Sequence, residues 1–367
     1  MSEAQQPAAS SSHSPSPNEP GAHAQPSPRR WGGWFGWILT IVLLVGMAWA
    51  VPIGEVWRTL RSADLGLVLV ACLPVFVNLL LRGPRWALLF RPHHLVCGRA
   101  VLAPALIGLA LNAVLPGRIG EFARIGIAAR GLGTSIGFTT STVIAERVLD
   151  ATVLLGFIGG ALLFLPTAAP GTTVAFAGFT LDAATVSVNA RRLGAIALTT
   201  LVALVAASRY GGTIAGWLRF VPGVSDNAVS AARRFAQELG RGATSLLRPR
   251  TLAVVVPLTI VMWGALTGAN WIVAHAVDGV TLSWSQALVV TALAIAGSAL
   301  PSAPGAWGTY EAGGLLGLAL VQVAPDSPAA IAFVVTSHIV SYVPVLVCGF
   351  IASWRTKAQR ADQEAKP

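Results

Sequence analysis

The sequence predicts an all-α polytopic integral membrane protein with two inverted repeats, each containing a re-entrant broken helix. The first supporting observation is composition: 54% of the 367 residues are hydrophobic and 11% are charged, whereas a soluble domain carries about 25% charged residues. The second is that the apolar residues form blocks of roughly 15–25 residues, the length of a helix that crosses a bilayer. The third is a Pro-Gly motif that occurs twice, at Pro116 and at Pro304.

The charge balance indicates a membrane protein rather than a nucleic-acid-binding one. The formal net charge is +10 and the sequence pI is about 10.9. The basic residues lie in short segments between apolar blocks, as in the cytoplasmic loops of inner-membrane proteins. The mean hydropathy of +0.68 excludes a water-soluble globular enzyme. The three cysteines, Cys72, Cys97 and Cys348, have no paired spacing, so neither a disulfide nor a metal site is expected.

Both ends of the chain are expected in the cytoplasm, with residues 31–353 forming the domain in a bacterial inner membrane. Residues 1–30 contain no long apolar run and predict a disordered tail. Arg29 and Arg30 precede the first predicted helix, at 34–52, and should hold the N-terminus inside. Residues 354–367 form a second predicted cytoplasmic tail, which carries Arg355, Lys357, Arg360 and Lys366.

The remaining apolar blocks predict helices at 65–81, 101–115, 134–165, 193–208, 251–275, 286–300, 311–323 and 329–353. Two cytoplasmic ends require an even number of full crossings. Short blocks such as 101–115 satisfy this requirement if they enter and leave the membrane on one side. A weakly apolar external loop is expected up to residue 189. The arginines that follow the block at 65–81 are assigned to a cytoplasmic segment: Arg82, Arg85, Arg91 and Arg99.

The basic segment at about 210–250 is amphipathic. Between 226 and 247 apolar residues recur at roughly helical spacing, and arginines occupy the other faces. Two interpretations stay open. The cluster of basic residues favours a helix that lies on the anionic cytoplasmic surface, and the alternative is a connecting helix packed on the bundle.

A duplicated motif is the most informative feature of the sequence. The first copy, at 112–121, reads NAVLPGRIGE, and the second, at 302–311, reads SAPGAWGTYE, with a shift of 188 residues between their Pro-Gly pairs. Neighbouring blocks match at nearly the same shift and predict repeats at about 65–165 and 251–353. The matched residues are Pro116, Gly117 and Gly120 in the first copy and Pro304, Gly305 and Gly308 in the second.

The two copies are expected to have opposite orientation in the membrane. The first is approached from the arginine-rich side, and the second from residues 276–285, which carry no Lys or Arg. Inverted repeats with broken helices near the midplane are common in transporters. Proline removes a backbone donor and glycine permits a sharp reversal, so each motif fits a re-entrant break. The alternative is a pair of ordinary tight turns between neighbouring helices.

Charged residues at membrane depth are the candidate site. A charge near the bilayer centre costs about 2.5–3.5 kcal/mol, so such groups normally pair or face water. Beside the breaks, Arg118, Glu121 and Glu311 favour a role in binding head groups or protons. For Arg124 an interfacial position is an equal alternative. For His338, a hydrogen-bonded core position is favoured over a proton relay.

The acidic residues of the block at 134–165 allow two interpretations. Glu146 and Asp150 are four residues apart and share a helix face, and Arg147 can pair with Asp150 three residues on. They fit either an anion-handling or proton-coupled cavity or a structural ion-pair network. The candidate binding and translocation residues are Asn112, Pro116, Gly117, Arg118, Gly120, Glu121, Arg124, Glu146, Arg147, Asp150, Pro304, Gly305, Gly308 and Glu311, with no catalytic residue and no metal ligand.

Four segments together resemble the flippase-like membrane family of the transmembrane domain of lysylphosphatidylglycerol synthases, also called UPF0104. They are LRGPRWALLF at 81–90, NAVLPGRIGEFAR at 112–124, ERVLD at 146–150 and ALPSAPGAWGTYE at 299–311. The resemblance covers about residues 34–353 and implies a polytopic inner-membrane protein that moves a lipid between leaflets. The aminoacyl-transferase domain of the bifunctional synthases is not expected in the 14 residues after Ser353.

The sequence therefore favours a lipid translocase that moves a phospholipid or another amphiphile. In this hypothesis Arg118 attracts a phosphate, and Glu121 and Glu311 meet cationic head groups or protons. The alternatives are a membrane-embedded enzyme acting on lipid-linked substrates and an accessory subunit that anchors a soluble enzyme. Expected partners are membrane lipids, with a second copy of the chain or a lipid-synthesis enzyme as further alternatives, and no nucleic acid. No cofactor is expected, and no nucleotide-binding loop is present.

Overall fold

The computed structural model describes residues 53–91, 94–115, 118–164, 173–176, 179–182, 248–300 and 304–364, and a few single residues between 210 and 237. The predicted tail at 1–30, the first helix at 34–52, the span at 193–208, most of the amphipathic segment, and Pro116 and Gly117 lie outside the described residues. The elements are α2 (Ile53–Ser62), α3 (Leu65–Phe90), α4 (Gly98–Val114), α5 (Ile119–Leu132), α6 (Ile136–Phe164), β1 (Thr173–Phe176), β2 (Phe179–Asp182), α9 (Pro249–Ala276), α10 (Trp284–Ser298), the 3-10 turn η3 (Pro304–Ala306), α11 (Thr309–Leu320) and α12 (Pro328–Glu364).

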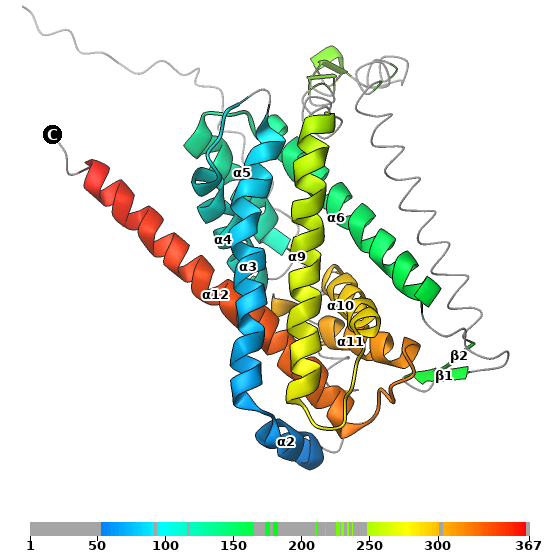
Figure 1. Cartoon of the computed structure of the whole chain (residues 1–367). Coiled ribbons are helices and arrows are strands. Elements are labelled where there is room, and N and C mark those ends of the chain that lie inside the picture. The colour runs from blue at the N-terminus through cyan, green and yellow to red at the C-terminus, as the bar shows by residue number, and fades with distance from the viewer. Residues whose placement is uncertain are drawn as a thin grey trace, which may run out of the picture.

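The described chain is a helical bundle, as predicted, with a small addition (Figure 1). Part of the segment expected to be an irregular external loop forms an antiparallel hairpin, in which Thr173 pairs with Asp182. A further helix, α2, lies before the predicted block at 65–81. At the other end α12 continues to Glu364, so the helix extends past the block predicted at 329–353 into the segment assigned to the tail.

The long helix α3 corrects a second boundary. The prediction ended this helix at 81, where Arg82, Arg85, Arg91 and Arg99 follow, but α3 continues to Phe90. Tertiary packing explains the difference. A Cβ atom on Gly83 would lie 2.6 Å from the backbone oxygen of Gly98 at the start of α4, so glycine permits a close approach of the two helices there. Arg82 and Arg85 therefore lie inside a helix and not in the segment that follows it.

Helices α3 and α9 pack side by side and run antiparallel (Figure 1). At one end the backbone nitrogen of Asp64 donates to the oxygen of Ala276 at 2.9 Å. In the middle, Asn78 Nδ2 donates to the oxygen of Met262 at 2.9 Å. The N-terminal end of one helix thus meets the C-terminal end of the other, and the short helices that follow them, α4 and α10, start at opposite ends of this pair.

Each Pro-Gly motif separates two short helices that pack on each other. In the first pair, a Cβ atom on Gly120 of α5 would lie 1.9 Å from the oxygen of Gly108 in α4. In the second pair, a Cβ atom on Gly297 of α10 would lie 2.1 Å from the oxygen of Thr309 in α11. Gly120 therefore permits the close contact between α4 and α5. The sequence analysis placed Gly120 among the candidate binding and translocation residues, and the structure gives it a close contact with α4.

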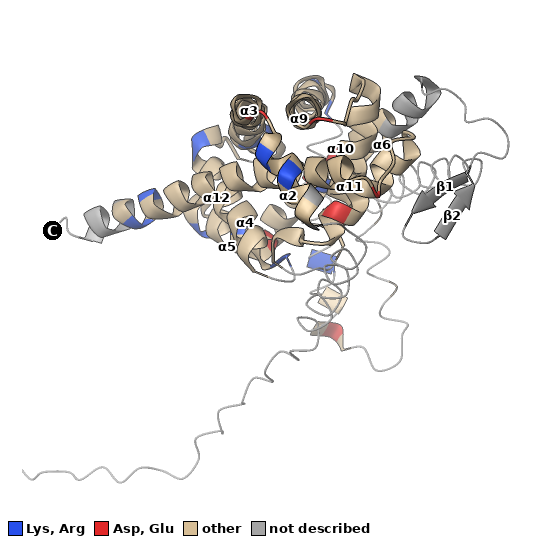
Figure 2. Cartoon of the chain, turned by 90° about the horizontal axis from the view of Figure 1, so that it is seen from below, with Lys and Arg blue, Asp and Glu red and all other residues tan. Residues whose placement is uncertain are grey.

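The long helices present apolar faces outward. Three of them, Leu65–Phe90, Pro249–Ala276 and Pro328–Ala358, are long and apolar enough to cross a membrane. Large exposed apolar side chains follow α3 and α12, including Leu69, Leu73, Leu80, Val343 and Phe350. Most of the ribbon in Figure 2 carries uncharged residues, and Lys and Arg occur on α2 and along the outer part of α12, among other places. Such faces suit contact with lipid.

Candidate functional site: a charged cavity between two helix breaks

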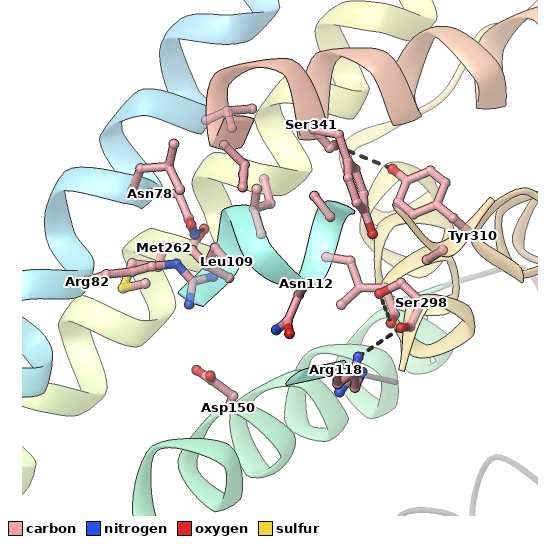
Figure 3. Close-up of a pocket in the computed structure, with 18 of the residues that line it drawn as sticks. Asn78, Arg82, Leu109, Asn112, Arg118, Asp150, Met262, Ser298, Tyr310 and Ser341 are labelled. Atoms are coloured by element: carbon pink, nitrogen blue, oxygen red, sulfur yellow. Dashed lines mark hydrogen bonds between the residues drawn. The ribbon is translucent and has the colours of Figure 1, made fainter. Parts of the chain in front are cut away.

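A cavity of about 230 Å³ lies where the two helix breaks meet. Its wall combines residues from α3, α4, α6, α9, α10, α11 and α12. In Figure 3, Arg82, Asn112 and Asp150 point into a common space from three different helices. Tyr310 and Ser341 border the same cavity from the other side. The cavity is therefore built by both halves of the chain.

Arg118 joins the two breaks directly. This residue forms the N-cap of α5 in a left-handed conformation, with φ 55°, which is uncommon for a side chain with a Cβ atom. Its Nη2 donates to the backbone oxygen of Ser298 at the end of α10, at 2.8 Å (Figure 3). The last carbonyls of a helix have no intrahelical donor, so the guanidinium satisfies one of them and remains at the cavity wall.

The second break contains the positive φ angles that its glycines predict. Gly305 has φ 74° within η3, and Gly308 has φ 84° as the N-cap of α11. Glycine adopts this region at little cost. Pro304 starts η3. Glu311 occupies the third position of α11, as Glu121 does in α5, so the two acids are equivalent by helix position although their spacing from the last glycine differs in the sequence.

Arg85 is the centre of a buried ion network behind the cavity. It is 1% exposed. Its Nη2 lies 2.8 Å from Glu146 Oε1, its Nη1 pairs with Asp150, and its Nη1 also donates to Thr259 Oγ1 at 3.2 Å. Glu146 and Asp150 thus share one helix face, as their spacing predicts, and that face is turned to an arginine.

Arg124 extends the same network to the first break. Its Nη2 lies 2.8 Å from Glu146 Oε2, and its Nε lies 3.1 Å from Glu121 Oε2. Its guanidinium carbon stands 4.7 Å from the ring centroid of Trp86, within the range of a cation–π interaction. Because Arg124 is 1% exposed, the alternative of an interfacial position is wrong.

Arg147 lies at the edge of the network and faces the cavity. It pairs with Asp150 at 3.8 Å, as predicted, and with Glu121 at 3.5 Å and Glu146 at 3.2 Å. Its side chain keeps 41% exposure, whereas that of Glu146 keeps 2%. The half-exposed guanidinium of Arg147 therefore faces the cavity while it is paired with the acids behind it.

The described residues of this region carry more positive than negative charge. Five guanidinium groups, from Arg82, Arg85, Arg118, Arg124 and Arg147, meet three carboxylates, from Glu121, Glu146 and Asp150. The formal surplus is two positive charges.

Arg82 is the least satisfied of these arginines. Its closest ionic contact is Glu146 at 3.7 Å, beyond hydrogen-bond distance, while its side chain is 16% exposed. Its buried Nε and Nη1 atoms have no hydrogen-bond partner among the described residues. Asn112 Oδ1 is likewise buried and unpartnered. Unsatisfied buried groups at a cavity wall are the groups that a ligand can satisfy.

Glu311 lies apart from the cavity. It is 1% exposed, its Oε2 accepts from the backbone nitrogen of Gly308 at 2.7 Å, and its Oε1 lies 2.5 Å from Nδ1 of His338. The structure therefore places this acid in a separate buried pair, and His338 is hydrogen-bonded, as the favoured interpretation had it.

Sequence reasoning missed Arg82, Arg85 and Asn78 as members of this region. Asn78 and Arg82 line the cavity, and Arg85 holds the network. A signal was present: apolar residues continue after Arg82 through Phe90, as they do in a helix that has not ended. Among the described residues no group of three or more His, Cys, Asp or Glu could hold a metal ion, and Arg85 fills the place between Glu146 and Asp150 that a cation would need.

Fold and site together define a polytopic helical membrane protein with a charged cavity enclosed by helices. The chain belongs to the family described as the lysylphosphatidylglycerol synthase TM region, which it matches over residues 34–349. This is a membrane family related to lipid handling. Comparison with curated proteins and with solved structures gave no match.

Proposed function

We propose that this protein moves an anionic phospholipid, or another amphiphile with a phosphate head group, between the leaflets of a bacterial inner membrane. The observation that carries the proposal is the cavity at the junction of the two breaks, with its surplus of positive charge. A phosphodiester would supply negative charge and acceptor oxygens to arginine donors. The acyl chains would remain in the bilayer beside the apolar faces of the long helices.

The arrangement of helices supports alternating access through inverted repeats. The series α3–α4–α5–α6 and α9–α10–α11–α12 share one order of long, short, short and long helices. Their first members run antiparallel. In this proposal the pairs α4–α5 and α10–α11 are re-entrant hairpins from opposite membrane faces, and the cavity opens to each face in turn, as in other transporters with inverted repeats.

Specific roles follow for the cavity residues. Arg82 and Arg118, on opposite walls, would bind the phosphate, because Arg82 has unpartnered donors and Arg118 lies between the breaks. Glu121 and Asp150 would keep Arg147 in position, so that the surplus charge is held at the wall. Both chain termini would lie in the cytoplasm, on the same side as the basic segments.

The test is lipid movement in vesicles that contain the purified full chain. A phosphatidylglycerol labelled on an acyl chain near its head group is followed by its access to an impermeant quencher. We expect wild-type protein to raise the transfer rate above that of protein-free vesicles, and Arg82→Gln and Arg118→Gln each to lower it at least about tenfold, since a charge-assisted bond contributes about 1.5–3 kcal/mol.

The matched control for both variants is Arg130→Gln, at an exposed position in the last turn of α5. It removes the same charge away from the cavity and should leave the rate unchanged. Equal rates with and without wild-type protein would refute the proposal, and so would variants at Arg82 and Arg118 that transfer lipid as fast as the wild type.

A further inference from the structure

A second buried polar cluster surrounds His338 in α12, apart from the arginine network. The two ring nitrogens of His338 face two acceptors: Nδ1 lies 2.5 Å from Glu311 Oε1, and Nε2 lies 2.8 Å from the backbone oxygen of Gly305. Both side chains of the pair are 1% exposed. The cluster therefore links the long helix α12 to η3 and to α11.

The number of protons in this cluster follows from hydrogen-bond chemistry. A backbone carbonyl only accepts, so Nε2 must carry the hydrogen of its contact with Gly305. The contact between Nδ1 of His338 and Oε1 of Glu311 needs a second hydrogen, either on Nδ1 or on the carboxyl group. In both cases the pair holds one proton more than a neutral imidazole and a carboxylate would hold, and its net charge is zero.

Three aromatic rings enclose the imidazole. The ring centroid of His338 lies 4.4 Å from that of Trp307, 4.5 Å from that of Tyr310 and 4.3 Å from that of Tyr342. The Tyr310 ring is stacked on it. The faces of aromatic rings attract cations, and the imidazole inside this cage is 1% exposed.

Few other charges act on the pair. Among the described residues of the helices that pack on α12, no arginine, lysine or second carboxylate forms an ion pair with either member. On the cavity side the nearby titratable and charged groups are Tyr310, Tyr342 and Arg118, whose charge acts on Tyr342. The bound proton therefore provides the local compensation for the Glu311 carboxylate.

The bound proton holds three pieces of the second break together. The other oxygen of Glu311 accepts from the backbone nitrogen of Gly308 and caps α11, while Gly305 belongs to η3. A neutral imidazole has one N–H and can donate to one of its two acceptors. After loss of the proton, the second contact would set acceptor against acceptor and leave a buried carboxylate without compensation, which is costly.

We propose that Glu311 and His338 form a proton-binding site that drives or gates lipid movement. Release of the proton to the aqueous side of the cavity breaks one N–H or O–H bond and detaches η3 or α11 from α12. Ala306 and Tyr310, which line the cavity, would then move with their elements. The coupling to lipid rests on the proposed function, whereas the proton site itself does not.

Proton binding is tested first, without any lipid assay. The full chain with ¹⁵N-labelled histidine is placed in lipid bilayers, and the imidazole nitrogens are followed by solid-state NMR between pH 5 and pH 10. The His338 signal is assigned by its loss in His338→Gln and by its shift in Glu311→Gln. The control is His275→Gln, which removes an exposed histidine whose contact stays within α9.

We expect the His338 nitrogens to change from a state with an extra shared proton to one with a single N–H across this range, and the change to move in Glu311→Gln. A His338 signal that stays the same from pH 5 to pH 10 would overturn the site. An unchanged His338 signal together with normal lipid transfer would overturn the proton site and leave the proposed function intact.

Coupling is tested in the vesicle assay with an imposed pH gradient and the membrane potential clamped. The wild type should transfer lipid at least about threefold faster with the gradient in one direction than in the other, and His338→Gln should lose this difference while His275→Gln keeps it. Wild-type transfer that ignores the gradient would overturn the coupling. Titration of His338 together with no lipid transfer under any gradient would reject the proposed function and keep the proton site.

Discussion

At the residue scale, Arg85 carries most of the consequences for stability. One guanidinium, 1% exposed, serves Glu146 and Asp150 from α6 and Thr259 from α9. This arginine offsets much of the cost of burying the two carboxylates, together with Arg124 and Arg147 at the edge of the network. The network of Arg85 therefore stabilises the helices that form the cavity. The residues available to a ligand are those that face the cavity, such as Arg82 and Arg118.

Replacing Arg85 with Met should destabilise the protein strongly. Removal of one partner from a buried ion pair costs about 3–5 kcal/mol; without Arg85, Glu146 keeps Arg124 and Arg147, but Asp150 keeps, among the described residues, only Arg147, at 3.8 Å. We expect a clear fall in the thermal unfolding midpoint of the purified protein in detergent, and loss of monodisperse material. Arg130→Gln, exposed on α5, should unfold like the wild type. An unfolding midpoint of Arg85→Met within error of that control would contradict this description of the network.

The residue scale also shows the limits of sequence reasoning. The pattern located the charged residues around the breaks, because a charge in an apolar block stands out. It predicted the pair of Arg147 and Asp150 within one helix but not the distant partners: Arg118 and Ser298 are 180 positions apart, and no periodicity relates them. Arg85 was assigned to a cytoplasmic segment because arginines follow the apolar block at 65–81, whereas α3 continues through Arg82 and Arg85 to Phe90.

At the scale of elements, the two short helical pairs depend on glycine at their crossing points. In α4–α5 the backbone of Gly120 approaches that of Gly108, and in α10–α11 the backbone of Gly297 approaches that of Thr309. The Pro-Gly motifs predicted both breaks, since their residue types suit a reversal. The sequence could not show that Gly120 also serves a helix contact, because that contact depends on how α5 is placed against α4.

Adding one methyl group tests this packing. In Gly120→Ala the new Cβ atom would lie 1.9 Å from the oxygen of Gly108, so α4 and α5 must separate, at a cost of about 1–3 kcal/mol. The control on the same helix is Gly131→Ala, where nothing lies within 4 Å and alanine should be neutral or stabilising by about 0.4–1 kcal/mol.

Thermal unfolding of the two variants in detergent measures the difference. We expect a lower unfolding midpoint for Gly120→Ala than for Gly131→Ala, together with slower lipid transfer, because Arg118 and Glu121 stand on the displaced helix. If Gly120→Ala matched the control in both measurements, the close contact of the two helices would not exist as described.

At the scale of the whole molecule, the antiparallel pair α3–α9 fixes the relation of the two halves. The contacts of Asp64 with Ala276 and of Asn78 with Met262 set the start of α4 and the start of α10 at opposite ends of the bundle. From the distribution of basic residues, the sequence predicts opposite membrane orientations for the two copies of the motif, and this stays a prediction. It placed Arg82 and Arg85 outside the helix that contains them, and it predicted no helix at the position of α5.

Labelling of single cysteines tests the orientation. Cys97 is exposed at the N-cap of α4, and Ser283 is exposed at the N-cap of α10. One variant keeps Cys97 alone, with the cysteines at 72 and 348 replaced by serine, and the other carries Ser283→Cys in a chain without native cysteines. An impermeant maleimide should label Cys97 in inside-out membranes and Ser283→Cys in right-side-out membranes. Labelling of both from one side would exclude inverted repeats.

The most direct test of the central claim, that the cavity holds an anionic lipid head group, is photo-crosslinking from its wall. A photoreactive amino acid replaces Leu109, which lines the cavity, and in a control chain it replaces Leu69, which is 62% exposed on α3. Mass spectrometry of the adducts formed in membranes identifies the lipids at each position. We predict adducts at Leu109 that are enriched in anionic phospholipid relative to those at Leu69, and loss of this enrichment when Arg82 is changed to Gln. Adducts of the same composition at both positions, or no lipid adduct at Leu109, would contradict the account.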